Sequence, residues 1–130
     1  MKVIDVVAGV IFSVDKSCVL LALRKPDQHQ GNLWEFPGGK MEAGETQAEA
    51  LTRELKEEIA ISVVDAKHRR TLEHRYSDKQ VRLHFWDVLQ FCGEERGCEG
   101  QQLAWVALDE LARLAFPEAN QLIVEELANL

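Results

Sequence analysis

The chain has 130 residues, of which 46% are hydrophobic and 28% are charged, and its net charge is −7. This length and mixture predict one globular domain, residues 1–130, with a sizeable core. The negative charge excludes a surface that coats nucleic acid, because phosphate polymers require clustered lysines and arginines. It does not exclude a single nucleotide as substrate, since a bound metal ion can supply positive charge locally.

Cysteine spacing and hydropathy indicate where the protein works. Cys18, Cys92 and Cys98 have neither CxxC spacing nor zinc-site spacing, so we expect reduced thiols and a cytoplasmic location. No apolar run approaches the roughly 20 residues of a membrane span. A signal peptide has an uninterrupted apolar run near its N-terminus, but here Asp5 interrupts the first apolar run. We therefore expect a monomer that binds neither a membrane nor a nucleic-acid polymer.

The first part of the chain alternates strands and turns. Its β-branched residues predict a strand over Val3–Val14, and Cys18–Leu23 follows after the turn Asp15–Ser17, so these two strands are expected to form a hairpin. After a polar loop at 26–32, Leu33–Phe36 predicts a short strand that leads into a Gly-Gly turn.

A helix is predicted from Gln47 to Ile59. Thr46 and Glu49 have the spacing of a capping box, which marks the start of this helix. Four apolar residues recur at helical spacing and are expected to form its buried stripe: Ala48, Leu51, Leu55 and Ile59.

The second half of the chain predicts long strands followed by helical segments. The expected elements are Ser62–Arg75, Val81–Phe91 and Leu103–Val106 as strands, a turn at Tyr76–Gln80, and Asp109–Leu114 and Pro117–Leu130 as helices. Strands interleaved with helices predict an α/β fold, in which helices cover both faces of a mixed sheet.

Three glutamates of the predicted helix, Glu54, Glu57 and Glu58, share one face because they stand at i, i+3 and i+4. Carboxylates held this close repel one another and raise each other's pKa values. Clustered carboxylate oxygens are also typical ligands of Mg²⁺, usually together with substrate phosphates. The pattern indicates either a metal site for phosphoryl chemistry or a solvated acidic helix face.

The residues around these acids match a known motif. Six positions have the spacing of the Nudix box: Gly39, Glu45, Arg53, Glu54, Glu57 and Glu58. The chain therefore resembles the Nudix family, which implies an α/β/α sandwich with a mixed sheet between helices. It also implies a hydrolase that uses Mg²⁺, with Mn²⁺ as an alternative. Ala60 replaces the glycine that ends the box, and an alanine in the left-handed conformation costs about 1 kcal/mol.

The resemblance implies roles for the matching residues. Metal ligands would be Glu54, Glu57, Glu58 and the Gly38 carbonyl, with Glu54 also the general base. Arg53 and Glu45 would be a pair that orients the acids. Glu99 resembles a loop acid that contacts the metals or the catalytic water.

Outside the box, the chain resembles the MutT branch of the family, the 8-oxo-dGTP diphosphatases. The segments Leu33–Lys40 and Phe116–Asn120 carry this resemblance. It implies phosphate contacts from Arg24, a closing loop that contains His29, and a substrate contact from Lys79, which stands where the branch often has arginine. An apolar slot for the base would be lined by Ile4, Val6, Phe36, Val81 and Pro117.

Asn120 has a chemical argument of its own. Oxidation at C8 of guanine converts N7 from an acceptor into an N–H donor. An amide can accept from N7–H and donate to O6, whereas unoxidised guanine would set acceptor against acceptor. The alternative is an asparagine that only starts the last helix.

These observations favour an enzyme that cleans the nucleotide pool by hydrolysing 8-oxo-dGTP to 8-oxo-dGMP and pyrophosphate, which would protect DNA replication. A second hypothesis is a pyrophosphohydrolase for other modified nucleotides, such as oxidised or methylated CTP or dCTP. A third, of another class, is a non-catalytic Nudix-like domain that senses a nucleotide. Such domains usually lose box acids, which this chain retains.

Overall fold

The computed structural model describes residues 2–28 and 31–130. Its elements in chain order are β1 (Lys2–Ile11), β2 (Cys18–Leu23), β3 (Trp34–Glu35), β4 (Gly38–Lys40), α1 (Gln47–Ile59), β5 (Ser62–Arg75), β6 (Lys79–Cys92), β7 (Leu103–Ala107), the 3-10 helices η1 (Leu108–Arg113) and η2 (Glu118–Asn120), and α2 (Gln121–Ala128). In this described part, no helix is long and apolar enough to cross a membrane.

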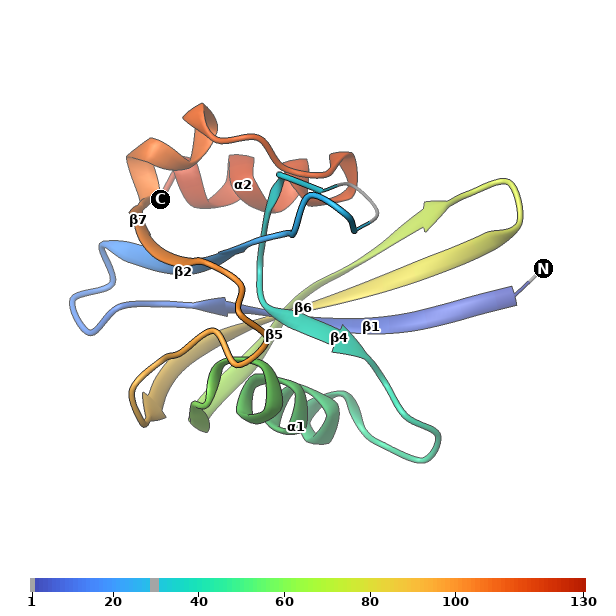
Figure 1. Cartoon of the computed structure of the whole chain (residues 1–130), viewed down its shortest axis with the longest axis horizontal. Helices are drawn as coiled ribbons and strands as arrows, with labels where there is room; N and C mark the ends of the chain where they lie inside the picture. Colours follow the sequence, from blue (N-terminus) through green and yellow to red (C-terminus); the bar gives the residue numbers. More distant parts are fainter. Residues whose placement is uncertain (1, 29–30) are drawn as a thin grey trace.

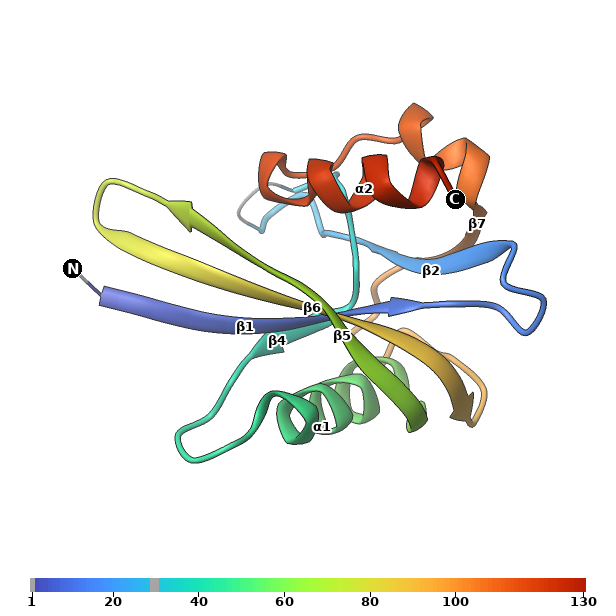
Figure 2. The ribbon, with the colours of Figure 1, turned by 180° about the vertical axis from the view of Figure 1, so that it is seen from behind.

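The strands form two sheets that lie between the helices (Figure 1). The larger sheet has the order β4-β1-β6-β5, with β1 parallel to β6 and the other pairs antiparallel. The smaller sheet is antiparallel, with the order β3-β2-β7. Seen from the front and from behind, α1 covers one side of the strands and α2 the other (Figure 2). The predicted α/β sandwich with a mixed sheet is confirmed.

Successive side chains of β1 and β2 point to opposite faces of their sheets, and a hydrophobic core lies on each face. Val7 and Ile11 of β1 pack in a cluster with the apolar stripe of α1. Their neighbours Ala8 and Val10 pack in the other cluster, which contains Ile123, Val124 and Leu127 of α2. Because both faces of these strands are buried, their sequences read as continuous apolar runs.

The predicted hairpin of the first two strands is wrong. β1 runs parallel to β6 along its whole length, from the pair Lys2–Lys79 to Ile11–Val88, whereas β2 pairs with β3 and β7. Among the described residues, backbone pairing between the end of β1 and the start of β2 is confined to the turn, where Phe12 forms an isolated bridge with Val19 and the Ser13 N–H donates to the Cys18 carbonyl. On the edge of β1 that faces β2, Val6–Ala8 pair with β4 instead, and β6 occupies the opposite edge.

Other boundaries shift by a few residues. The first strand ends at Ile11 instead of Val14, and the last α-helix begins at Gln121 after the η2 turn. The segment predicted as a helix at Asp109–Leu114 is the 3-10 helix η1. In α1 the buried alanine is Ala50, while Ala48 is exposed.

The predicted ends of α1 are confirmed. Thr46 accepts a hydrogen bond from the Glu49 N–H and donates its own N–H to the Glu49 carboxylate, which completes the capping box. At the other end, Ala60 has φ 64° and ψ 27°, and its N–H donates to the Leu55 and Lys56 carbonyls. This left-handed alanine carries the steric cost that a glycine would avoid.

Ala60→Gly should therefore raise the free energy of unfolding by about 1 kcal/mol. Chemical denaturation of the two proteins measures this difference. The matched control is Ala48→Gly, an exposed site inside the same helix, where glycine should lower stability by about 1 kcal/mol. An Ala60→Gly protein that is less stable than the parent would contradict the argument.

Candidate active site

Two carboxylates of α1 lie against the glycine pair of β4. The Gly38 N–H donates to Glu58 Oε2 at 3.2 Å, and a Cβ added to Gly39 would lie only 2.3 Å from Glu54 Oε2. A Cβ on Gly38 would lie 1.9 Å from the Val7 carbonyl oxygen of β1. Any side chain at either glycine would separate the strand from the acids, which explains why this segment needs two glycines.

Arg53 connects the predicted site residues of the helix and its preceding loop. Its guanidinium donates to both oxygens of Glu45, at 2.7 and 2.9 Å, to Glu54 at 2.9 Å and to Glu57 at 3.3 Å. It also donates to the Lys40 carbonyl at 3.1 Å. The bidentate pair with Arg53 lowers the pKa of Glu45 to about 2. The predicted contact of Arg53 with Glu45 and the acids is thus present.

Glu58 lies in a strongly acidic environment. Burial, together with repulsion by Glu54, Glu35 and Glu99, raises the pKa of Glu58 to about 8. Burial also raises the pKa of Glu35, and the Arg24 guanidinium, 2.7 Å from its carboxylate, opposes that shift. One hollow is lined by all three acids, Glu35, Glu58 and Glu99, as well as by Arg24.

The loop that carries Glu99 is tied to the end of α1. The Cys98 N–H and the Gln101 side chain both donate to the Glu58 carbonyl, at 2.9 and 3.2 Å. Gln101 also accepts from the Glu99 N–H at 2.9 Å. The two bonds to Glu58 satisfy a carbonyl that the helix end leaves unpaired, and together with the bond to Glu99 they bring this loop acid to the acids of the helix.

The raised pKa of Glu58 predicts a pH dependence of stability. Between its ordinary value of 4.5 and about 8, the folded chain holds a proton on Glu58 that the unfolded chain has released. The free energy of unfolding therefore falls as pH rises through this range. Melting temperatures in EDTA should drop from pH 5 to pH 8, and Glu58→Gln should make that slope shallower.

Glu57→Gln is the control for this measurement, since the Glu57 side chain is 61% exposed. It should keep the slope of the parent. Glu35, whose pKa is also raised, adds a slope of the same sign that remains in Glu58→Gln. The lowered pKa values of Asp5, Asp15 and Glu45 act at more acidic pH, outside this range. An unchanged slope in Glu58→Gln would contradict the prediction.

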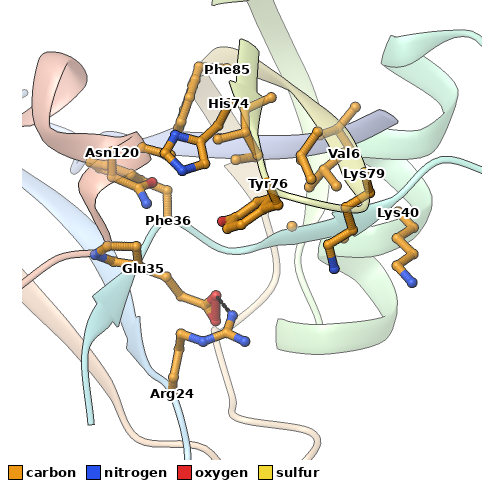
Figure 3. A pocket seen from close by; sticks show the side chains of 18 residues that line it. Val6, Arg24, Glu35, Phe36, Lys40, His74, Tyr76, Lys79, Phe85 and Asn120 are labelled. Carbon is orange, nitrogen blue, oxygen red and sulfur yellow. Dashed lines mark hydrogen bonds and ion pairs between the residues drawn. The ribbon is translucent and has the colours of Figure 1, made fainter. Parts of the chain in front are cut away.

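A second cavity, of about 300 Å³, adjoins the acids and is lined by both apolar and polar side chains (Figure 3). It shares Arg24, Glu35 and Gly38 with the acidic hollow. Phe36 is buried in its wall, stacked on Phe116 at 5.7 Å. Four of the five residues predicted for the apolar slot line it: Val6, Phe36, Val81 and Pro117. Ile4 lies beside a separate hollow with Lys40 and Met41.

The structure also locates the remaining predicted residues. Lys79 and Asn120 line the cavity, with the Lys79 ammonium 5.5 Å from the centre of the Tyr76 ring. Asn120 precedes α2, but its side chain makes no capping hydrogen bond. Asn120 thus starts the helix by its position, while its side chain takes no part in the capping. His29 lies outside the described residues.

Glu35, His74 and Tyr76 are among the cavity residues that were missed in the sequence. Glu35 could have been predicted as a site residue, because it is an acid within the otherwise apolar run Leu33–Phe36. His74 lies near the end of β5, and Tyr76 lies in the β5–β6 turn. They line the cavity because β6 pairs with both β5 and β1, which brings this part of the chain beside β1. No local sequence pattern indicates that long-range placement.

The described residues contain no group of three or more histidine, cysteine, aspartate or glutamate side chains gathered closely enough to hold a metal ion by themselves. Glu54 and Glu57 are instead engaged by Arg53. The oxygen donors nevertheless suit a hard divalent cation. Glu58 in particular lies among acids whose repulsion raises its pKa, and a bound cation would relieve that repulsion.

Comparison with known proteins places these features in context. A NUDIX domain model matches residues 7–126. The 8-oxo-dGTP diphosphatase of Escherichia coli is 36% identical over 130 residues, which cover 100% of both chains. The CTP pyrophosphohydrolase of the same organism is 36% identical over 125 residues, covering 96% of this chain and 91% of that protein. A solved MutT structure, from work on Aliivibrio salmonicida and Vibrio cholerae, has a TM-score of 0.88 at 39% identity and covers 98% of each chain.

Proposed function

Since the chain belongs to the NUDIX family of hydrolases, we propose that it hydrolyses 8-oxo-dGTP to 8-oxo-dGMP and pyrophosphate with the help of Mg²⁺. The observation that carries this proposal is the joining of two sites. A cavity of about 300 Å³, which is lined at one end by Asn120, shares Arg24, Glu35 and Gly38 with the hollow that is lined by Glu58 of α1 and by Glu99. A base held in the cavity would extend its phosphates toward those acids.

The residues suited to hold the metal are Glu54, Glu57, Glu58 and Glu99, with the Gly38 carbonyl. Bound Mg²⁺ would polarise phosphate oxygens and lower the pKa of a bound water. Mg²⁺ commonly binds through one or two carboxylates and completes its shell with waters and substrate phosphates, so the acids need not gather in advance.

Glu54 would act as the general base. Its carboxylate would take the proton from the water whose oxygen attacks the β-phosphorus. The bond from that phosphorus to the bridging oxygen breaks, and the bridging oxygen leaves with the nucleoside monophosphate. Arg53 holds Glu54 in place through its bond at 2.9 Å. Arg24, beside Glu35 at the junction of the two hollows, would contact the phosphates.

The resemblance to a CTP pyrophosphohydrolase at 36% identity supports a second candidate, hydrolysis of CTP or a modified dCTP. The Asn120 amide, which makes no hydrogen bond to the described residues, favours the first candidate, because it matches the N7–H and O6 edge of the oxidised purine.

The test is pyrophosphate release from 8-oxo-dGTP, dGTP, CTP and 5-methyl-dCTP, with Mg²⁺ and with EDTA. We expect the highest kcat/KM for 8-oxo-dGTP and no turnover in EDTA. A preference for either cytosine nucleotide would select the second candidate. Binding without turnover of any nucleotide would select the non-catalytic sensor.

A further inference from the structure

The β5 strand presents one face to the base cavity. Near its end, Leu72 and His74 are partly buried, whereas Thr71, Glu73 and Arg75 are exposed. This alternation places His74 on the same side as Leu72, which packs against the core that contains Phe36 and Phe85. His74 accordingly lines the cavity.

His74 differs from the other histidines in the described part of the chain. His68 is hydrogen-bonded to Thr71, and His84 to Thr71 and Asp5. His74 makes only a ring contact: it lies edge-on to Tyr76, with the ring centres 4.7 Å apart and an angle of 66°. Among the described residues its ring nitrogens have no hydrogen-bond partner, although the ring is held in place and partly buried.

The same is true of Asn120. Its backbone N–H donates to the Pro117 carbonyl, but its side-chain amide has no partner among the residues that the structure describes. Figure 3 shows the His74 ring and the Asn120 amide at one end of the cavity, and Lys40 and Lys79 away from it. Two polar groups without partners therefore lie where the base would be, apart from the acids that would handle the phosphates.

The edge of 8-oxoguanine needs more than one amide. It presents O6, N7–H and O8 in a row, as acceptor, donor and acceptor. The Asn120 amide can pair with O6 and N7–H, which leaves O8 in a partly apolar cavity. An acceptor buried without a donor carries its full desolvation penalty. An imidazole has an N–H donor in either tautomer and when protonated.

We propose that His74 is a second specificity-determining residue, which donates a hydrogen bond to O8 of the oxidised base. This proposal rests on the proposed function. O8 is absent from guanine, so the bond favours 8-oxo-dGTP over dGTP. The phosphates and the metal site are common to both nucleotides and cancel in the ratio of their kcat/KM values.

His74→Phe tests the proposal, because phenylalanine keeps an aromatic ring against Tyr76 and removes the donor. The ratio of kcat/KM for 8-oxo-dGTP to that for dGTP should fall by about tenfold or more, the effect of one unpaired buried group. The matched control is His68→Phe. His68 lies on the same strand and is edge-on to Trp86, with the ring centres 5.8 Å apart and an angle of 85° between the rings, but it does not line the cavity. This variant should leave the ratio unchanged.

His74→Gln separates hydrogen bonding from ring packing, since it returns an N–H donor without the ring. It should keep a larger ratio than His74→Phe. Equal losses in the two variants would assign the effect to packing and overturn the proposal. A ratio unchanged in His74→Phe would also overturn it and leave the proposed function standing. A parent protein without any preference for 8-oxo-dGTP would instead overturn the proposed function itself.

Discussion

Glu54→Gln should lower kcat by at least about 100-fold, the low end of the contribution of a general base. Glutamine keeps the shape of the side chain but cannot accept the proton of the attacking water. The Glu54 side chain is only 13% exposed, between Arg53 and Gly39, so no other carboxylate easily takes its place. Nucleotide binding should change little, because the cavity for the base is left intact.

The measurement combines pyrophosphate release at saturating nucleotide with titration of a non-hydrolysable analogue. The matched control is Glu42→Gln. Glu42 also forms an ion pair with Arg53, at 3.3 Å, but its side chain is 63% exposed, so turnover should stay near that of the parent. Near-normal turnover in Glu54→Gln would move the base to Glu99. Glu45 is a poor substitute, because both its oxygens are bonded to Arg53 and its pKa is about 2.

Asn120→Ala should reduce the preference for 8-oxo-dGTP over dGTP by orders of magnitude. Sites that hydrogen-bond a polar group can reject analogues lacking it by about 10⁴-fold. The oxidised base loses a matched pair of hydrogen bonds in this variant, whereas guanine loses an unfavourable contact. The kcat/KM for 8-oxo-dGTP should therefore fall steeply, while that for dGTP should stay the same or rise.

Steady-state kinetics with both nucleotides measures this ratio in the parent and the variant. Asn129→Ala is the control, since Asn129 lies at the other end of α2 and donates to the Glu125 carbonyl at 2.8 Å. It should keep the preference of the parent. A preference that survives in Asn120→Ala would show that another residue reads the base.

Features that depend on neighbours in the sequence were predicted well. The helix α1 has the predicted bounds, Gln47–Ile59, because its capping box and its i, i+4 apolar pattern act within one or two turns. The contact of Arg53 with Glu45 could be predicted for the same reason, since the loop that carries Glu45 directly precedes the helix and lies close to its first turns. The acids of α1 were found for the same reason.

Features that depend on distant pairing were not predicted. Gly38–Lys40 is a strand only because it pairs with Val6–Ala8 of β1, and glycines give no local strand signal. The hairpin of the first two strands failed because β1 pairs with β4 on one edge and with β6 on the other, about 30 and about 75 residues later in the chain. His74 and Tyr76 enter the cavity through the pairing of β1 with β6, so their place could not be read from their neighbours.

The short segment from Glu35 to Gly38 borders both the acidic hollow and the cavity for the base. These two sites are otherwise built from different elements of the chain. The acids are carried by α1 and the loop after β6, while His74 comes from the end of β5, Tyr76 from the β5–β6 turn and Asn120 from the segment before α2. Evolution can thus alter substrate range without disturbing catalysis, by changing two peripheral segments. Transplanting residues 72–81 and 115–121 from a relative with another base preference should yield a chimera with the donor's selectivity and the recipient's turnover.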